Sequence, residues 1–313
     1  MSTGTSERLA FIGTGIMGAP MAGHLLSAGH AVRVHTRTRS RAEDLLRRGA
    51  TWADSPADAA READVVFINV PDTPDVEAVI LGDRGVLSVA REGMVVVDHS
   101  TISPSATRRM NDALSARGAR LLDAPVSGGD VGARNATLSI MVGGDEAAFT
   151  RVRPLLERLG KTITHCGPSG AGQSTKLVNQ ILVSVTNLAV CEALVFAKKN
   201  GLDLNKTVSA LAGGAAGSWQ LANLGPRMVA GDFAPGFMID LQVKDLRLVC
   251  EAAREASLHP AATDLVKRLF ETGQAEGRGR EGTQALFAVV EEAESGGPSP
   301  VAKLIRHGSE PRQ

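Results

Sequence analysis

The feature that most constrains the fold of this chain is a glycine-rich turn between an apolar run, residues 8–12, and a segment with helical spacing, residues 17–28. The turn has the sequence Gly13, Thr14, Gly15, Ile16, Met17 and Gly18. The first glycine permits a tight turn, the second lets a pyrophosphate approach the backbone, and the third lets helix and strand pack closely. The amide groups at the start of the helix then hold the phosphates. The flanking segments favour this dinucleotide-binding turn over a plain packing turn.

The end of the next predicted strand, residues 31–35, bears on the form of the dinucleotide. A site for NAD usually has an Asp or Glu there, about 20 residues beyond the glycines. This chain has Arg37 and Thr38 instead, and its first carboxylate after the strand is Glu43. An arginine suits the 2′-phosphate of NADP, which it binds through charge-assisted hydrogen bonds. We therefore expect NADP as the cofactor and keep NAD as the alternative; a solvated loop is the other interpretation of the arginines.

The order of apolar and helical segments predicts two domains. Further strand-like runs occur at residues 64–70, 94–97, 120–124, 138–142 and 162–165, with helical segments among them. This alternation predicts an α/β Rossmann domain over residues 1–167, with a mostly parallel sheet covered on both faces. From Gly170 the pattern is helical, at residues 170–199, 204–211, 220–229, 239–256 and 261–271. We expect an all-helical domain over residues 168–294, a loop at 277–282, and a loose tail over residues 295–313.

A second glycine pair follows the strand at residues 120–124. The stretch Asp123-Ala-Pro-Val-Ser127-Gly128-Gly129 exposes several backbone amides together, and the serine adds a hydroxyl donor. Such a concave site suits a carboxylate. A flexible turn is the alternative interpretation, and the spacing alone does not exclude it.

Residues 170–201 predict one long, largely buried helix, because apolar residues occur on every side of it. Lys176 lies in its first turns, and Asn179 and Gln180 share its face at i+3 and i+4. A polar cluster in an apolar helix must be satisfied internally or meet a polar ligand. Partial burial lowers the pKa of a lysine and brings it nearer to acid–base work. The alternative is a lysine in the first turns that reaches water.

Composition excludes several classes of function. The 34 basic and 34 acidic residues cancel, and aromatic residues make up 3% of the chain, so nothing indicates a nucleic-acid partner. Residues 177–197 include Asn179, Gln180, Asn187 and Glu192, which argue against a membrane helix. Three widely spaced cysteines offer neither a disulfide framework nor a metal site, which favours a cytoplasmic protein without metal. His99, at a strand end, is more typical of a structural histidine than of a catalytic one.

Several stretches in order resemble the 3-hydroxyacid (β-hydroxyacid) dehydrogenase family, over about residues 8–294. They read GTGIMGAPMAGHL, DAPVSGG, GAGQSTKLVNQ, GGAAGS and DFAPGFMIDLQVKDL. The wording is nearest to the tartronate semialdehyde reductases within that family. The resemblance implies a Rossmann domain, an all-helical domain, and hydride transfer between NADP(H) and a short 3-hydroxy acid or its semialdehyde.

The resemblance also implies roles for individual residues. Lys176 is the expected acid–base residue, and the other expected cofactor-facing residues are Val70, Pro71, Thr101 and Lys244. The expected contacts of a small carboxylate substrate are Ser127, Gly128, Gly129, Asn179, Gln180 and Trp219. From the sequence alone Trp219 is either part of a packing turn or a pocket wall, and Lys244 with Asp245 is open to interpretation as a surface ion pair.

Alternatives remain within the family and outside it. They are 3-hydroxyisobutyrate or serine-type dehydrogenases, glyoxylate or succinic semialdehyde reductases, and imine reductases, although imine reductases usually replace the lysine. A dinucleotide-binding scaffold without catalysis is the remote alternative. We expect a homodimer or homotetramer, because the family likeness and the apolar helix fit a helical domain that packs against a second copy.

Overall fold

The computed structural model describes residues 7–294 of the 313-residue chain. The chain divides into two compact units, Met1–Lys176 and Leu177–Gln313, called here the sheet unit and the helical unit. The division falls inside one long helix, so Lys176 belongs to the sheet unit and Asn179 and Gln180 to the helical unit. The expected tail at 295–313 lies outside the described residues.

The sheet unit contains a nine-stranded, mostly parallel sheet. Its strands are β1 Leu9–Ile12, β2 Val32–His35, β3 Thr51–Trp52, β4 Val65–Ile68, β5 Val95–Asp98, β6 Arg120–Asp123, β7 Val126–Ser127, β8 Leu138–Gly143 and β9 Gly160–Gly167. They follow the order β3-β2-β1-β4-β5-β6-β8-β7, with β9 beside β8. The six strands from β3 to β6 along this order are parallel. Strand β8 runs antiparallel to β6 and β7. The strand order reverses between β1 and β4, which is where ligands bind in such sheets.

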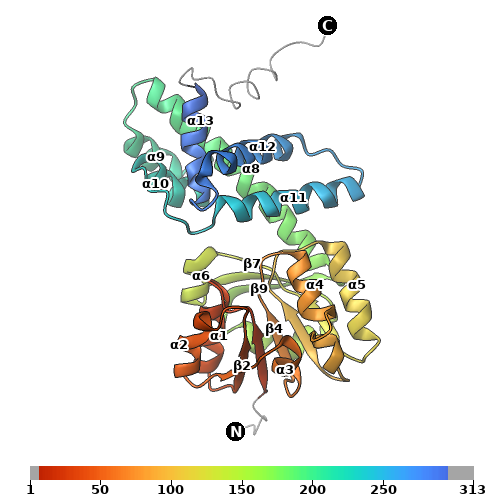
Figure 1. The fold of residues 1–313 in the computed structure, drawn as a ribbon. Helices are drawn as coiled ribbons and strands as arrows, with labels where there is room; N and C mark the ends of the chain where they lie inside the picture. The colour runs from red at the N-terminus through yellow and green to blue at the C-terminus, as the bar shows by residue number, and fades with distance from the viewer. Residues whose placement is uncertain (1–6, 295–313) are drawn as a thin grey trace. The chain divides into compact units, whose positions relative to one another are not determined.

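Alternation along each strand directs side chains to two separate cores. Leu9 and Phe11 join one core with α1 Gly18–Ser27, α2 Glu43–Arg47 and α7 Glu146–Leu156. Ala10 and Ile12 join the other with α3 Pro56–Ala60, α4 Thr73–Leu81 and α5 Pro104–Ser115. Figure 1 shows α1 and α2 on one side of the strands and α4 and α5 on the other. The Rossmann fold predicted from the sequence is therefore confirmed.

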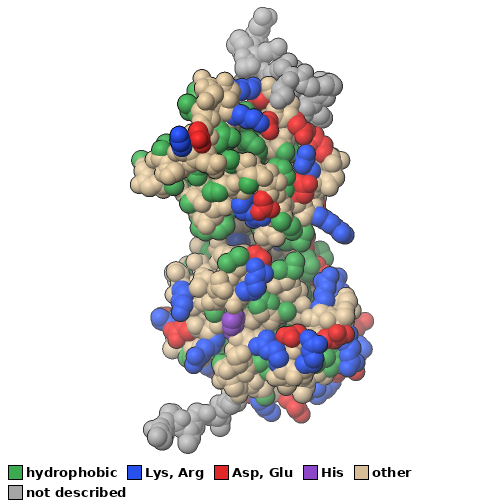
Figure 2. Space-filling view, turned by 90° about the vertical axis from the view of Figure 1, so that its left-hand side faces the viewer, with side chains coloured by type: hydrophobic (Ala, Val, Ile, Leu, Met, Phe, Trp, Pro, Cys, Tyr) green, Lys and Arg blue, Asp and Glu red, His purple; other side chains and the backbone are tan. Residues whose placement is uncertain are grey.

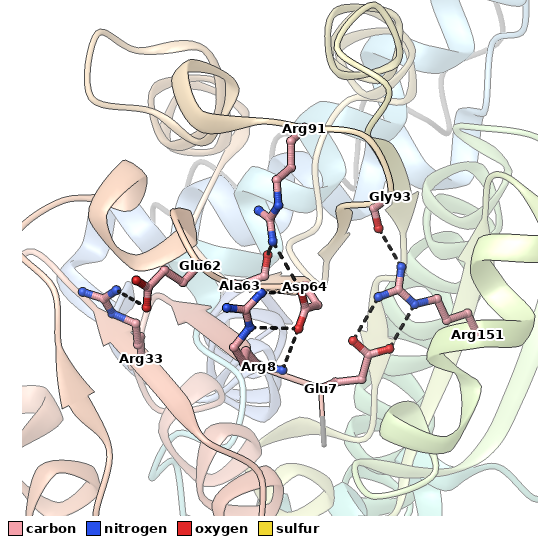
Figure 3. A network of polar contacts seen from close by, with 9 residues as sticks. All are labelled: Glu7, Arg8, Arg33, Glu62, Ala63, Asp64, Arg91, Gly93 and Arg151. Atoms are coloured by element: carbon pink, nitrogen blue, oxygen red, sulfur yellow. Dashed lines mark hydrogen bonds and ion pairs between the residues drawn. The ribbon is translucent and has the colours of Figure 1, made fainter. Parts of the chain in front are cut away.

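A polar network ties together the amino ends of β1, β4 and β5 (Figure 3). The backbone amide and the guanidinium of Arg8 donate to Asp64, and Arg91 donates to the same carboxylate. Arg151 binds Glu7 and the carbonyl of Gly93. The Arg8 guanidinium holds the pKa of Asp64 below its usual value. This network lies at the edge of the sheet opposite the glycine-rich turn, so we assign it to stability.

The main apolar core of the helical unit is formed by segments far apart in the sequence. Its helices are the later part of α8 Ala171–Lys199, α9 Leu204–Ala212, η3 Gln220–Leu224, α10 Gly225–Val229, α11 Ile239–Glu255, α12 Ala261–Gly273, η4 Gln274–Arg278, η5 Thr283–Ala285 and α13 Leu286–Glu294. Cys191, Ile239, Phe270 and Leu286 are among the buried residues of this core. The all-helical prediction is confirmed, but α13 was not predicted. Helix η4 ends at Arg278, but Gly277 within it has a φ of +86°, so the backbone leaves helical geometry at the start of the predicted 277–282 loop.

Helix α8 is less buried than its sequence predicts. By length and composition it is long and apolar enough to cross a membrane, yet half of its most apolar stretch is buried within the protein. Its buried Asn187 donates to the carbonyl of Thr283, as in a protein core. Val178, Leu182 and Phe196 are exposed. Figure 2 shows many hydrophobic side chains at the surface of the helical unit, and basic and acidic side chains interspersed over both units.

Candidate active site

The glycine-rich turn lies between the carboxyl end of β1 and the start of α1. Gly13 has a φ of +95°, and a Cβ atom there would lie 2.1 Å from the carbonyl oxygen of Asn69. A Cβ atom at Gly18 would lie 1.9 Å from the carbonyl oxygen of Gly13. These contacts explain the first and third glycines, because any side chain would force the turn open.

The same turn fits the phosphates of a dinucleotide. A Cβ atom at Gly15 would meet no other atom within 4 Å, so the backbone there is open to a ligand. Helix α1 has no side-chain cap and no acidic residue in its first turn, so its amides are available to donate hydrogen bonds to an anion. The Thr14 hydroxyl is buried and has no hydrogen-bond partner among residues 7–294. Exposed Ile16 and half-buried Met17 complete the turn.

Beyond β2, the structure places Arg37 next to a carboxylate that the sequence pattern did not reveal. Arg37 Nη1 lies 3.0 Å from Asp75 Oδ1, and the Arg37 side chain is 78% exposed. Asp75 comes from the first turn of α4. Arg39, two residues on, stacks its guanidinium on the Trp52 ring at 5.2 Å. Thr38 precedes the short helix η1 Arg39–Ala42. The 2′-phosphate of NADP could therefore replace Asp75 as the partner of Arg37.

The ends of β4 and β5 meet beside the glycine-rich turn. The Val70 amide donates to the Ser100 hydroxyl at 3.0 Å, next to Thr101. Pro71 is exposed on the same loop. His99 Nδ1 lies 2.7 Å from the carbonyl oxygen of Ala124, and its ring stacks on Phe67. Burial lowers the pKa of His99 to about 4, so the ring is neutral near pH 7. His99 therefore has the features of a structural histidine.

The predicted carboxylate loop follows β6. Ser127 ends β7, and Gly128 and Gly129 both have positive φ values. Helix α6 Gly129–Asn135 then begins, and His24 of α1 bonds the carbonyl oxygens of Ala133 and Arg134 at its end. The loop is therefore tied to the helix that follows the glycine-rich turn.

Lys176 lies six residues into α8, in the same unit as the two glycine loops. Its side chain is buried, with 7% of the residue exposed. A buried ammonium group is costly unless it meets polar groups, which distinguishes this lysine from a surface lysine. The alternative of a lysine that reaches water is not favoured by this burial.

In the helical unit, the amides predicted on α8 join a buried polar chain. Asn179 Nδ2 donates to Gln180 Oε1 at 2.8 Å, and Gln180 Nε2 donates to Asp245 Oδ2 at 2.6 Å. Lys244 Nζ lies 2.7 Å from Asp245 Oδ1, and the two side chains are 15% and 3% exposed. This ion pair is therefore not the surface pair that the sequence left open. Gln180 uses both ends of its amide here.

Trp219 precedes η3, a π-helical turn, and is 62% exposed. An exposed indole does not fill a core, so of the two interpretations from sequence the packing turn is disfavoured. Sequence reasoning missed the long-range contacts of Asp75, Asp123 and Gln173 in this region. Their partners lie 38, 47 and 73 residues away, and no local motif signals them.

Comparison with known proteins follows the same division. Residues 8–167 match the NAD-binding domain of 6-phosphogluconate dehydrogenase, and residues 170–290 match the NAD-binding domain of NADP-dependent 3-hydroxyisobutyrate dehydrogenase. The chain is 45% identical to 2-hydroxy-3-oxopropionate reductase of Escherichia coli, covering 91% of this chain and 97% of the other.

Solved structures show the same likeness. The complex of 3-hydroxyisobutyrate dehydrogenase of Mycobacterium tuberculosis with L-serine has a TM-score of 0.84 and 33% identity, covering 91% and 99% of the two chains. Psf3 in complex with NADP+ and 2-OPP has a TM-score of 0.82 and 29% identity, covering 90% and 99%.

Proposed function

Because this chain belongs to the 3-hydroxyacid dehydrogenase family of NAD(P)-dependent oxidoreductases, we propose that it interconverts a short 3-hydroxy acid and its semialdehyde with NADP(H). Tartronate semialdehyde (2-hydroxy-3-oxopropionate) is the favoured substrate. The 45% identity to the Escherichia coli reductase supports this choice, and so does the motif wording. The observation that carries the proposal is a buried lysine, Lys176, in the unit that also holds the phosphate-binding turn.

Each group of site residues has a proposed task. When bound, the nicotinamide ring of NADP(H) would supply or accept the hydride. Lys176, as ammonium, donates a proton to the oxygen of the aldehyde as its carbon is reduced, and takes it back in the reverse direction. Ser127 and the amides of Gly128 and Gly129 bind the substrate carboxylate. Holding that carboxylate fixes the position of the reacting carbon. Such positioning lowers the barrier to the reaction.

The polar chain in the helical unit supports a further division of tasks. Gln180 is buried and bonded at both ends of its amide, whereas the Asn179 carbonyl oxygen has no bond to the described residues. We assign Asn179 to substrate contact and Gln180 to holding it. Lys244, oriented by Asp245, is assigned to the cofactor, and exposed Trp219 to the substrate side.

A substrate panel with both cofactors tests the function. We expect the fastest NADPH-dependent reduction with tartronate semialdehyde. Reduction of methylmalonate semialdehyde, succinic semialdehyde and glyoxylate should be slower. Oxidation of L-serine and 3-hydroxyisobutyrate is measured in the same series. A higher kcat/KM for either of these would move the assignment to that branch of the family, and no turnover with any of them would favour the non-catalytic scaffold.

Cofactor choice has its own test at Arg37. Replacing Arg37 with Ala should raise KM for NADPH about tenfold or more, because a charge-assisted hydrogen bond contributes about 1.5–3 kcal/mol. KM for NADH should change little. The matched variant Asp75→Asn should lower KM for NADPH, since it removes the competing partner of Arg37 and a like charge near the 2′-phosphate. A wild-type enzyme that prefers NADH would overturn the NADP assignment.

A further inference from the structure

The first turn of α8 is held by a carboxylate from another part of the sheet unit. Asp123, at the end of β6, accepts a hydrogen bond from the Gly170 amide at Oδ1 and from the Gln173 amide at Oδ2, each at 2.8 Å. Its side chain is fully buried. A helix begins with amides that lack intrahelical partners. A carboxylate there accepts hydrogen bonds from them and interacts favourably with the helix dipole. Most such caps come from the preceding residues, whereas this one comes from 47 residues earlier.

Direct contact between backbones fixes the same turn. Gly143 of β8 pairs with Asp123 across the sheet. A Cβ atom at Gly143 would lie 2.6 Å from the Gly172 amide nitrogen, and one at Gly172 would lie 2.4 Å from the Asp123 carbonyl oxygen. Real Cβ atoms do not approach so closely, so the two backbones are in direct contact and a side chain at either glycine would displace the helix start.

Gln173 joins this turn to the loop after β5. Its side chain is fully buried, donates from Nε2 to the Ser100 carbonyl at 2.8 Å, and accepts at Oε1 from the Ile102 amide at 3.1 Å. The two bonds flank Thr101 on either side. One amide therefore fixes the peptide groups around the residue that is expected to face the cofactor.

We propose that Asp123 and Gln173 are positioning residues that hold Lys176 in register with Thr101 and with the Ser127–Gly129 loop. Lys176 follows Gln173 by one helical turn, and the loop begins four residues after Asp123. All of these residues lie in the sheet unit. The inference rests on the proposed role of Lys176 as the acid. A misplacement of about 1 Å at such a group can cost a hundredfold in rate.

The test compares two buried glutamines. Gln173→Met keeps the side-chain volume but removes both hydrogen bonds, and we expect kcat to fall about a hundredfold. The matched control is Gln284→Met in the helical unit, because Gln284 is also buried and donates to two backbone carbonyls. We expect the kcat of Gln284→Met to stay within about twofold of the wild type. The midpoint of thermal unfolding should fall in both variants, because each loses two buried hydrogen bonds. Asp123→Asn should lower kcat in the same way as Gln173→Met.

Hydrogen exchange separates this inference from the proposed function. In Gln173→Met, the amides of residues 100–103 and 170–176 should lose protection together. If the wild type shows no turnover with any substrate but this paired loss occurs, the positioning stands and the assigned function fails. A Gln173→Met enzyme with wild-type kcat, or a Gln284→Met enzyme that loses as much, would refute the positioning role.

Discussion

Replacing Lys176 with Ala should lower kcat by about a thousandfold, while NADPH binding stays at the wild-type level. A positioned acid contributes about 10²- to 10⁴-fold to the rate of proton transfer. The turn proposed to bind the phosphates lies elsewhere in the sheet unit and makes no use of the lysine in this proposal. Lys176→Arg should fail as well, because a guanidinium keeps its proton at neutral pH and is a poor acid.

The experiment is steady-state kinetics beside calorimetric titration with NADPH. The control is Lys161→Ala, since Lys161 is an exposed lysine of the same unit and should be silent. Turnover by Lys176→Ala within tenfold of the wild type would remove the lysine from the mechanism and leave the family assignment without its acid.

The second large effect concerns stability at acid pH. His99 is neutral in the folded protein because burial lowers its pKa from 6.5 to about 4. The unfolded chain binds a proton at His99 between these two values and the folded chain does not, so acid favours unfolding. His99 therefore has no effect on the pH dependence of the free energy of unfolding above pH 6.5. That free energy falls as the pH falls from 6.5 towards 4. A difference of this size corresponds to about 3 kcal/mol in the free energy of unfolding.

His99→Asn isolates this contribution. An Asn side chain places its amide nitrogen near Nδ1 and can still donate to the carbonyl oxygen of Ala124. Asp58 and Asp64 also have lowered pKa values and also weaken the fold in acid, but they are the same in both proteins. Urea unfolding from pH 7 to pH 4 should therefore show a shallower loss in the variant. Parallel curves for the two proteins would mean that His99 is not buried as a neutral ring.

Local patterns were enough to predict much of this protein. The strand, turn and helix around Gly13 could be predicted because the residues that form the turn are adjacent in sequence. Helix α8 could be predicted from a continuous stretch of the sequence in which apolar residues occur on every side. The antiparallel pairing of β8 with β6 and β7 carried no such signal. The Arg37–Asp75 pair and the Asp123–Gly170 bond are set by topology, so sequence spacing could not reveal them.

The burial of α8 was overestimated for a related reason. Apolar residues all around a helix indicate a core position only if every face has a neighbour, and Val178, Leu182 and Phe196 are exposed in this chain. Lys244 and Asp245 show the opposite case, because two adjacent charges on a helix suggest the surface but form a buried pair.

The contact between Gly143 and Gly172 is made by main chain alone, and it has a consequence for how such an enzyme changes over evolutionary time. Peptide groups pack in the same way whatever substrate is present, so this contact places no demand on the residues that select a substrate. Mutations at exposed positions such as Trp219 can then be sampled without moving the proposed acid. A scaffold of this kind would retain its chemistry while its substrate preference drifts.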